Sequence, residues 1–380
     1  MLFGTGRISQ LGSNRTGHQF AAPANLGFVL IDAAAYQVLR PDGNIRKGAR
    51  PALDEEFVLE GLRWMMLSRA FDIRGTALQR QGRFGVMSPV MGQEASVVGS
   101  AMAFDPSIDW LVPQYRELPA YLMWGMPLWK HIANLSGNPV EGRIPDDVKL
   151  LPLQVALAAQ LPHAAGLAWG LKIQREEGIV LTYLGEGGSS EGDFHEACNL
   201  AGVVKAPIVF FLQNNQWAIS TPRAYQSAAA HLADRGLGYG FEGRVVDGND
   251  ILAVYETTKE AVERARAGEG PTLIESITYR MSFHNTTDNP SRYQDPKELA
   301  EAAERDPIDR VKKYLAGLGM WDEKREREMT ESIEAEIDEA IARAQEAPPP
   351  QPSQIFDHVF AEMTPGLQRQ RRELLDGAGS

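Results

Sequence analysis

A strand, a helix and a second strand between residues 179 and 212 constrain the fold more than any other feature of this sequence. Residues 179–184 and 207–212 are short apolar, β-rich runs, and the first ends directly at glycines. Between them, residues 190–203 carry apolar side chains at helical spacing, with Ser189 or Ser190 as a candidate N-cap. Two strands joined by such a helix lie parallel in one sheet. We therefore predict an α/β fold with a parallel sheet and helices on both faces.

Oxygen ligands follow both of these strands. Gly185-Glu186-Gly187 comes after the first strand, and Asn214-Asn215 comes after the second, with residues 188–213 between the two motifs. The carboxyl ends of parallel strands meet at one edge of a sheet, so Glu186 and Asn215 are expected to be neighbours. Mg²⁺ prefers oxygen ligands and keeps substrate phosphates in its coordination shell, whereas zinc would favour His or Cys. The helix N-terminus after Gly188 offers N–H groups to an anion. The motifs therefore predict magnesium held on a diphosphate.

The two motifs together resemble the thiamine diphosphate signature. The wider run 185–222 resembles the alpha subunit of the decarboxylating component of 2-oxo acid dehydrogenase complexes, and the resemblance extends from about residue 53 to residue 368. Further ordered matches are Gln81-Gly82-Arg83, Gly92-Gln93-Glu94-Ala95, Pro113-Gln114-Tyr115-Arg116-Glu117, Val246-Asp247-Gly248-Asn249-Asp250 and Tyr279-Arg280 leading to His284. The resemblance implies a thiamine diphosphate-binding fold.

The resemblance also implies site residues. Glu186, Asn215 and the main-chain oxygen of Trp217 stand where the family holds Mg²⁺. Gln114, Tyr115 and Arg116 stand at the cofactor diphosphate, and an Arg fork suits the charge that Mg²⁺ leaves unbalanced. The other expected cofactor-binding residues are Gly187 and Gly188, whose N–H groups would approach the phosphates, and Val155 and Leu157, which would line the cofactor.

His284 is the expected catalytic residue. It follows an expected strand over residues 272–279, and in the family this loop carries a histidine beside thiamine diphosphate that assists acyl transfer to a lipoyl group. The other six histidines are expected to be solvated, and of these His195 lies on the helix beside the metal loop. Four positions depart from the family pattern: Phe283 stands where many relatives have Gly or Pro, Asn285 replaces a Ser or Thr, Gln213 replaces an Arg, and Val86 replaces a frequent Phe. The last leaves the acyl-chain preference open.

The sequence shows no second unit with the family's pyrimidine-binding pattern, which points to a partner. The resemblance implies a beta subunit in an α₂β₂ heterotetramer that docks on a dihydrolipoyl acyltransferase. The implied reaction is oxidative decarboxylation of a 2-oxo acid with reductive acylation of the lipoyl group. Residues 125–166 and 185–222 favour a pyruvate dehydrogenase, whereas residues 185–193 and 320–323 favour a branched-chain 2-oxo acid dehydrogenase. Acetoin dehydrogenase and a non-catalytic, complex-organising subunit are the remaining alternatives.

Composition and pattern define the outer parts of the chain. The net charge of −12 disfavours nucleic acid and anionic membranes, and the sole cysteine, Cys198, lies on the apolar face of its helix. The first 25 residues contain no acid, as in a mitochondrial transit peptide, but they lack helical amphipathicity, which favours a disordered arm of a cytoplasmic bacterial protein. We expect a flexible arm (1–50), the cofactor-binding domain (51–300) and a helical extension packed on it (301–380). Further helices are expected at residues 54–80, 102–132 with a polar loop, 161–173, 298–305, 308–318 and 322–345, with a polyproline spacer at 348–350.

Overall fold

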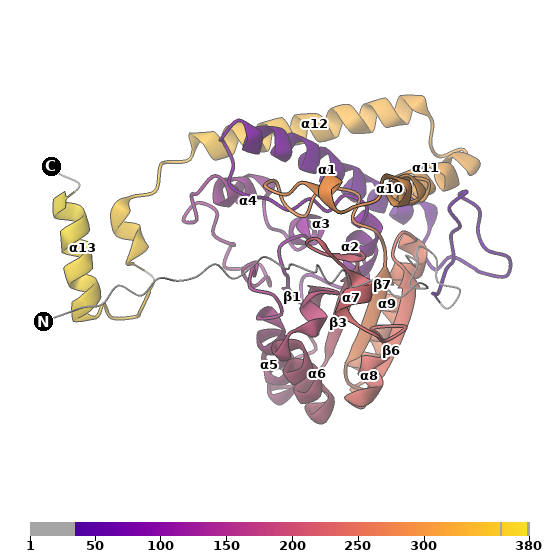
Figure 1. The fold of residues 1–380 in the computed structure, drawn as a ribbon, viewed down its shortest axis with the longest axis horizontal. Coiled ribbons are helices and arrows are strands. Elements are labelled where there is room, and N and C mark those ends of the chain that lie inside the picture. The colour runs from indigo at the N-terminus through magenta and orange to yellow at the C-terminus, as the bar shows by residue number, and fades with distance from the viewer. Residues whose placement is uncertain (1–34, 358, 378–380) are drawn as a thin grey trace, which may run out of the picture.

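The computed structural model describes residues 35–357 and 359–377, and a five-stranded parallel sheet lies at its centre (Figure 1). The strand order is β1-β2-β3-β7-β6, with all neighbours parallel. The bounds are Trp110–Val112 for β1, Val180–Gly185 for β2, Ile208–Asn214 for β3, Glu242–Asp247 for β6 and Thr272–Ile277 for β7. The predicted α/β class and the predicted parallel strand pair at 179–184 and 207–212 are confirmed.

Side chains that alternate along the central strands feed two separate cores. Leu181 and Phe211 lie in one core, whereas Leu184 and Phe210 lie in the other. All four side chains are fully buried, because the sheet is covered on both faces. The helices α5 (Gln160–Gln174) and α6 (Gly192–Val204) cover one face, and α2 (Glu94–Ala101) and α9 (Ile251–Arg266) cover the other. Cys198 is buried on α6, as predicted.

The start of α6 differs from the prediction. The helix begins at Gly192 after a short 3₁₀ turn, Gly188–Ser190, and its N-cap residue is Glu191, which makes no side-chain capping hydrogen bond. Ser189 does not cap the helix, because its hydroxyl group donates to the Glu186 carbonyl oxygen at 2.6 Å. The serine therefore stabilises the turn that carries Glu186 instead.

The expected helix over residues 102–132 is wrong in part. This stretch contains β1, α3 (Leu118–Met123) and the start of α4 (Leu128–Leu135). Residues Trp110–Val112 extend the sheet because they pair with residues Val180–Thr182 of β2. Gly125 then separates the two helices at a φ of 98°, a conformation that glycine adopts without strain. The polar loop with Gln114, Tyr115 and Arg116 thus follows a strand and lies at the same sheet edge as Glu186.

An outer helical layer covers α2. The helix α1 (Glu55–Arg80) packs on α2, and α11 (Pro307–Gly317) and α12 (Glu323–Glu346) pack on α1. The apolar stripe of α12, including Ile333 and Ile337, belongs to the same core as the sheet. The predicted helical extension therefore packs on the domain as far as residue 346. The helix α10 (Pro296–Ala303) precedes α11.

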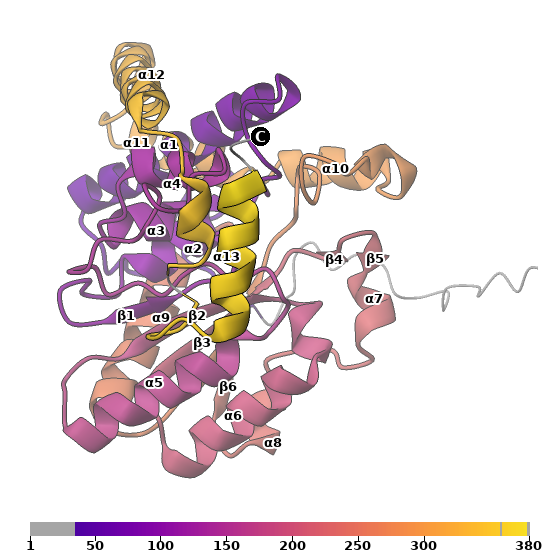
Figure 2. The same cartoon turned by 90° about the vertical axis from the view of Figure 1, so that its left-hand side faces the viewer.

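The last helix departs from that expectation. The helix α13 (Pro365–Gly377) packs against the 3₁₀ turn η3 (Pro352–Ile355), and no residue described in this helix is buried. Figure 1 shows α13 at one end of the molecule, and Figure 2, viewed from that end, shows it in front of the domain. The extension thus does not pack on the domain along its whole length.

The structure also corrects the extent of the predicted N-terminal arm. Residues 35–50 lie against the domain, where Val38 and Leu39 are fully buried and Tyr36 pairs with Val246 beside β6. The carboxylate of Asp250 accepts hydrogen bonds from the N–H groups of Val38 (2.7 Å) and Leu39 (2.6 Å). The remainder of the predicted arm, residues 1–34, lies outside the described residues. Within the described ranges, no helix has the length and apolar character needed to cross a bilayer.

Candidate cofactor and metal site

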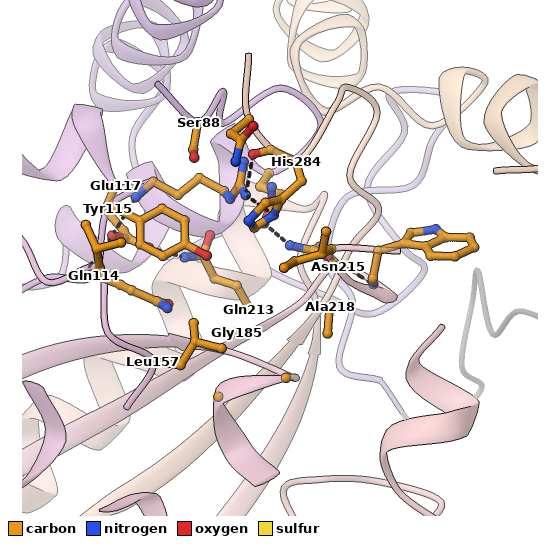
Figure 3. Close-up of a pocket in the computed structure, with 18 of the residues that line it drawn as sticks. Ser88, Gln114, Tyr115, Glu117, Leu157, Gly185, Gln213, Asn215, Ala218 and His284 are labelled. Atoms are coloured by element: carbon orange, nitrogen blue, oxygen red, sulfur yellow. Dashed lines mark hydrogen bonds between the residues drawn. The ribbon is translucent and has the colours of Figure 1, made fainter. Parts of the chain in front are cut away.

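A cavity of about 640 Å³ opens at the carboxyl edge of the sheet (Figure 3). It collects every residue that the sequence singled out for the site, although these residues come from five separate segments. They are Gln114, Tyr115, Arg116, Val155, Leu157, Glu186, Gly187, Gly188, Asn215, Trp217 and His284. The size of the cavity is that of an ordinary small-molecule site. The structure thus brings these residues together in one cavity. The role of each residue stays a prediction.

The predicted neighbours Glu186 and Asn215 are in contact. Gly185 at the end of β2 lies opposite Gln213 of β3, so the residues that follow both strands meet. The Glu186 carboxylate accepts a hydrogen bond from the Asn215 N–H group at 3.1 Å. Its side chain is 1% exposed, and burial raises the pKa of the carboxyl group.

Three further hydrogen bonds fix the Asn215 amide group and the Trp217 carbonyl oxygen of the expected metal site. Asn215 donates through its Nδ2 to Gln93 Oε1 at 3.0 Å, and its Oδ1 accepts from the Trp217 N–H group at 3.1 Å. The Trp217 carbonyl oxygen accepts from Arg280 Nη1 at 3.2 Å. Each of these oxygens keeps a second lone pair. A tight hairpin, formed by β4 (Trp217–Ala218) and β5 (Thr221–Pro222), carries this part of the site.

The two predicted glycines differ in their surroundings. A Cβ atom on Gly187 would lie 2.6 Å from the Ala218 Cβ atom, which is too close for any side chain at this position. A Cβ atom on Gly188 would have its nearest neighbour, the Ala158 nitrogen, at 3.9 Å. The hairpin therefore requires a glycine at 187, whereas position 188 has room for a Cβ atom.

Arg116 and His284 are hydrogen-bonded to each other. The Arg116 guanidinium donates through Nη2 to His284 Nδ1 at 3.2 Å and to the His284 carbonyl oxygen at 3.0 Å. Because arginine can only donate, Nδ1 is the acceptor and the proton of the neutral imidazole lies on Nε2. The Tyr115 ring packs edge-on against His284, with ring centroids 6.1 Å apart. Burial, followed by the positive charges of Arg116 and Arg280, lowers the His284 pKa to about 4. His284 is thus neutral at physiological pH in this arrangement.

The loop that carries His284 is anchored at its far end. Asp288 accepts a hydrogen bond from the His284 N–H group at 2.8 Å and another from the Tyr293 hydroxyl at 2.5 Å. Arg280 donates to the Tyr293 hydroxyl at 2.6 Å and to the Ile219 carbonyl oxygen at 2.7 Å. The histidine loop and the hairpin with Trp217 therefore share Arg280 as a common anchor.

Several polar residues of the cavity could not be predicted from the sequence. Glu117 is 1% exposed and accepts hydrogen bonds from the backbone of Gln114 and Arg116 and from Gln213 Nε2 at 2.7 Å. Glu117 and Gln93 belong to two of the motifs that resemble the family. A short motif does not indicate which of its side chains point into the cavity. The expectation of a solvated histidine is wrong for His131, because it is buried at the cavity lining between the Phe71 and Tyr121 rings, and this burial lowers its pKa to about 4.

His195 does not reach the cavity lining. It lies on the exposed side of α6, where its Nδ1 atom is hydrogen-bonded to the Tyr239 hydroxyl group. Its solvated position agrees with the expectation for the histidines other than His284.

A buried carboxylate, a fixed amide and a main-chain oxygen thus lie at the carboxyl edge of a parallel sheet, which is where α/β proteins bind their ligands. The model of the dehydrogenase E1 component family matches residues 62–353. The 3-methyl-2-oxobutanoate dehydrogenase subunit alpha of Mycobacterium tuberculosis is 40% identical over 352 residues, which cover 90% of this chain and 94% of that protein. The pyruvate dehydrogenase E1 component subunit alpha of Staphylococcus epidermidis is 41% identical over 336 residues, which cover 88% and 90%. The corresponding Staphylococcus aureus protein is 40% identical over the same length. The chain belongs to the dehydrogenase E1 component family, as an alpha subunit of the 2-oxo acid dehydrogenase type.

Proposed function

We propose that this alpha subunit binds thiamine diphosphate and Mg²⁺ and, with a beta subunit, decarboxylates a 2-oxo acid, pyruvate being favoured. The acyl group would pass to the lipoyl group of a dihydrolipoyl acyltransferase. The observation that carries the proposal is the meeting of Glu186, Asn215 and the Trp217 carbonyl oxygen in one cavity with Arg116 and His284. An α₂β₂ assembly in the cytoplasm of a bacterium is part of the same proposal.

Two buried polar groups of the cavity lining support the binding of such a cofactor. Gln93 Nε2 and Gln213 Oε1 are buried at the lining, and neither has a hydrogen-bond partner among residues 35–357 and 359–377. Buried polar atoms without partners carry a desolvation penalty that a polar ligand can relieve. A ligand with both donors and acceptors therefore suits this part of the cavity.

The charges of the lining support the proposal of a metal ion beside the diphosphate. Within the described lining, Arg116 supplies the fixed positive charge, whereas Asp72, Glu117, Glu186 and Glu191 are acids. A diphosphate monoester brings roughly three further negative charges, and Mg²⁺ would offset two of them. Glu186, Asn215 and the Trp217 oxygen would hold the metal ion, and Arg116 would face the phosphates.

When bound, the thiazolium ring would supply the nucleophilic carbon and the electron sink for loss of CO₂. The chain itself would orient the diphosphate through Arg116 and place the Nε2–H group of His284 beside the reacting atoms. Pairing of Arg116 with a diphosphate would remove one cause of the low His284 pKa. The imidazole would then be better suited to donating a proton to the lipoyl sulfur during acyl transfer.

Substrate choice is the finer part of the proposal. The relatives named above include both a pyruvate enzyme and a 3-methyl-2-oxobutanoate enzyme at nearly equal identity. We favour pyruvate because the 125–166 and 185–222 patterns are closer to bacterial pyruvate dehydrogenases. The test is kcat/KM of the assembled component for pyruvate and for 3-methyl-2-oxobutanoate. We expect the ratio to favour pyruvate, and a preference for the branched substrate would reassign the chain. Turnover of acetoin, which has no carboxyl group to lose, without turnover of either 2-oxo acid would support the acetoin dehydrogenase alternative.

The pH dependence of cofactor binding follows from Glu186. Burial raises its pKa, and Mg²⁺ requires the carboxylate, so affinity is present above the raised pKa and is lost as the pH falls through it. We expect Mg²⁺-dependent affinity for thiamine diphosphate to weaken on acidification. The pH at which it weakens should be higher than the pH at which an ordinary glutamate becomes protonated. Calorimetric titrations between pH 8 and pH 5.5, corrected for protonation of the cofactor itself, measure this. A flat profile in protein that stays folded would contradict the assignment.

A further inference from the structure

Residues Met87–Gly92, here called the 87–92 segment, lie between α1 and the loop that carries His284. On the loop side, the Met281 N–H group donates to the Met91 carbonyl oxygen at 3.2 Å, and the Thr286 N–H group donates to the Met87 carbonyl oxygen at 3.0 Å. Thr286 Oγ1 also accepts from the Met87 N–H group at 3.3 Å. The segment therefore holds the histidine loop on both sides of His284.

The same segment holds Arg116. The Pro89 carbonyl oxygen accepts a hydrogen bond from Arg116 Nη1, while the other terminal nitrogen, Nη2, is bonded to His284. The distance between the Arg116 and His284 side chains thus depends on where the segment places Pro89. The approach to the loop is close, because a Cβ atom on Gly92 would lie 2.3 Å from the Tyr279 carbonyl oxygen.

One carboxyl group on α1 fixes the middle of this segment. Asp72 Oδ2 accepts hydrogen bonds from the N–H groups of Val90 at 2.8 Å and Met91 at 3.0 Å, which lie between the two carbonyl groups that contact Arg116 and Met281. Asp72 is 4% exposed and sits on a long helix that is packed into the main core. Met87 is also held from α1, because its Sδ atom fills the space that Gly75 leaves.

We propose that Asp72 is a positioning residue for Arg116 and His284, which acts by fixing the 87–92 segment against α1. The inference rests on the function proposed for His284. Asp72 accepts both N–H groups through a single oxygen, so the acceptor atom is the feature required of the side chain, and an amide oxygen can replace it.

The test uses the assembled holoenzyme with Asp72→Ala, Asp72→Leu and Asp72→Asn. A displacement of about 1 Å at reacting groups can lower a rate by about 100-fold, and we expect this loss of kcat for acyl transfer to a lipoyl domain in the Ala and Leu variants. KM for the lipoyl domain should stay unchanged. Hydrogen exchange of the Met281 and Thr286 amides should become faster in both. Asp72→Asn should restore both properties toward those of the unchanged enzyme.

Ser68→Ala is the matched control, because Ser68 is buried one turn away on α1 and its hydroxyl group bonds within the helix, to the Trp64 carbonyl oxygen. We expect it to leave transfer and exchange unchanged. If the Asp72 variants do not assemble, Thr286→Val is the alternative variant, because Thr286 lies at a half-buried loop position and its hydroxyl oxygen accepts from the Met87 N–H group. We expect it to change acyl transfer and hydrogen exchange in the same direction as the Asp72 variants, but by less.

Failure of this inference and failure of the proposed function give different results. Unchanged transfer and exchange in the Asp72 variants, with transfer impaired in His284→Ala, would overturn the role of Asp72 alone. Faster exchange in the Asp72 variants, with normal transfer in His284→Ala, would support the contact but remove the function assigned to His284.

Discussion

Replacing Glu186 by alanine is expected to abolish Mg²⁺-dependent binding of thiamine diphosphate. Residues that merely support metal ligands alter metal affinity by 10- to 100-fold, so loss of a carboxylate ligand should lower affinity by more than about 100-fold. Calorimetric titration of the α₂β₂ assembly with thiamine diphosphate, at fixed Mg²⁺, measures the change. The structural reason is that Glu186 supplies the buried carboxylate of the expected ligand set, whereas Asn215 and Trp217 supply neutral oxygens.

The matched control for this substitution is Glu196→Ala, since Glu196 is an exposed residue of α6 outside the cavity lining. It should leave cofactor affinity unchanged. Normal affinity in folded, assembled Glu186→Ala would remove Glu186 from the metal site.

Replacing His284 by alanine is expected to leave cofactor binding largely intact while acyl transfer to the lipoyl group falls. A positioned acid or base contributes about 10²- to 10⁴-fold to such a step, and we expect a loss within this range. Arg116 loses its Nδ1 partner in the variant but keeps the Pro89 carbonyl oxygen and the carbonyl oxygen of residue 284. Decarboxylation measured with an artificial electron acceptor separates the two steps, because it does not require transfer to a lipoyl group.

His195→Ala serves as the control for His284→Ala, because His195 bonds to Tyr239 on the outer side of α6. Its transfer rate should match that of the unchanged enzyme. An unaltered transfer rate in His284→Ala would show that the histidine has no part in this step.

The centre of the fold could be predicted because the sequence signals there are strong. Buried parallel strands are nearly continuous apolar runs, and the glycines after residue 184 mark where the first one ends. Adjacent strand ends then fix Glu186 beside Asn215. The remaining site residues came from the family resemblance, and the cavity brings all of them together.

Other parts depend on partners that are distant in sequence. The three residues of β1 are too few for a periodic signal and become a strand by pairing with β2. Residues 35–50 look like a loop until the Asp250 carboxylate binds their N–H groups from more than 200 positions away. Asp72 lies on the side of α1 that turns toward the cavity, and in the sequence it is one acid within an ordinary helix. Sequence periodicity indicates which side chains are buried, but it does not indicate which backbone N–H groups a buried acid such as Asp72 will bind.

CO₂ release by the chain assembled with its beta subunit tests the central claim most directly. The assay would supply pyruvate and 3-methyl-2-oxobutanoate separately, each with and without thiamine diphosphate and Mg²⁺. The account predicts release from at least one of these 2-oxo acids that requires both thiamine diphosphate and Mg²⁺. A well-formed α₂β₂ tetramer that releases CO₂ from neither substrate, or releases it equally without cofactor and metal, would contradict the account.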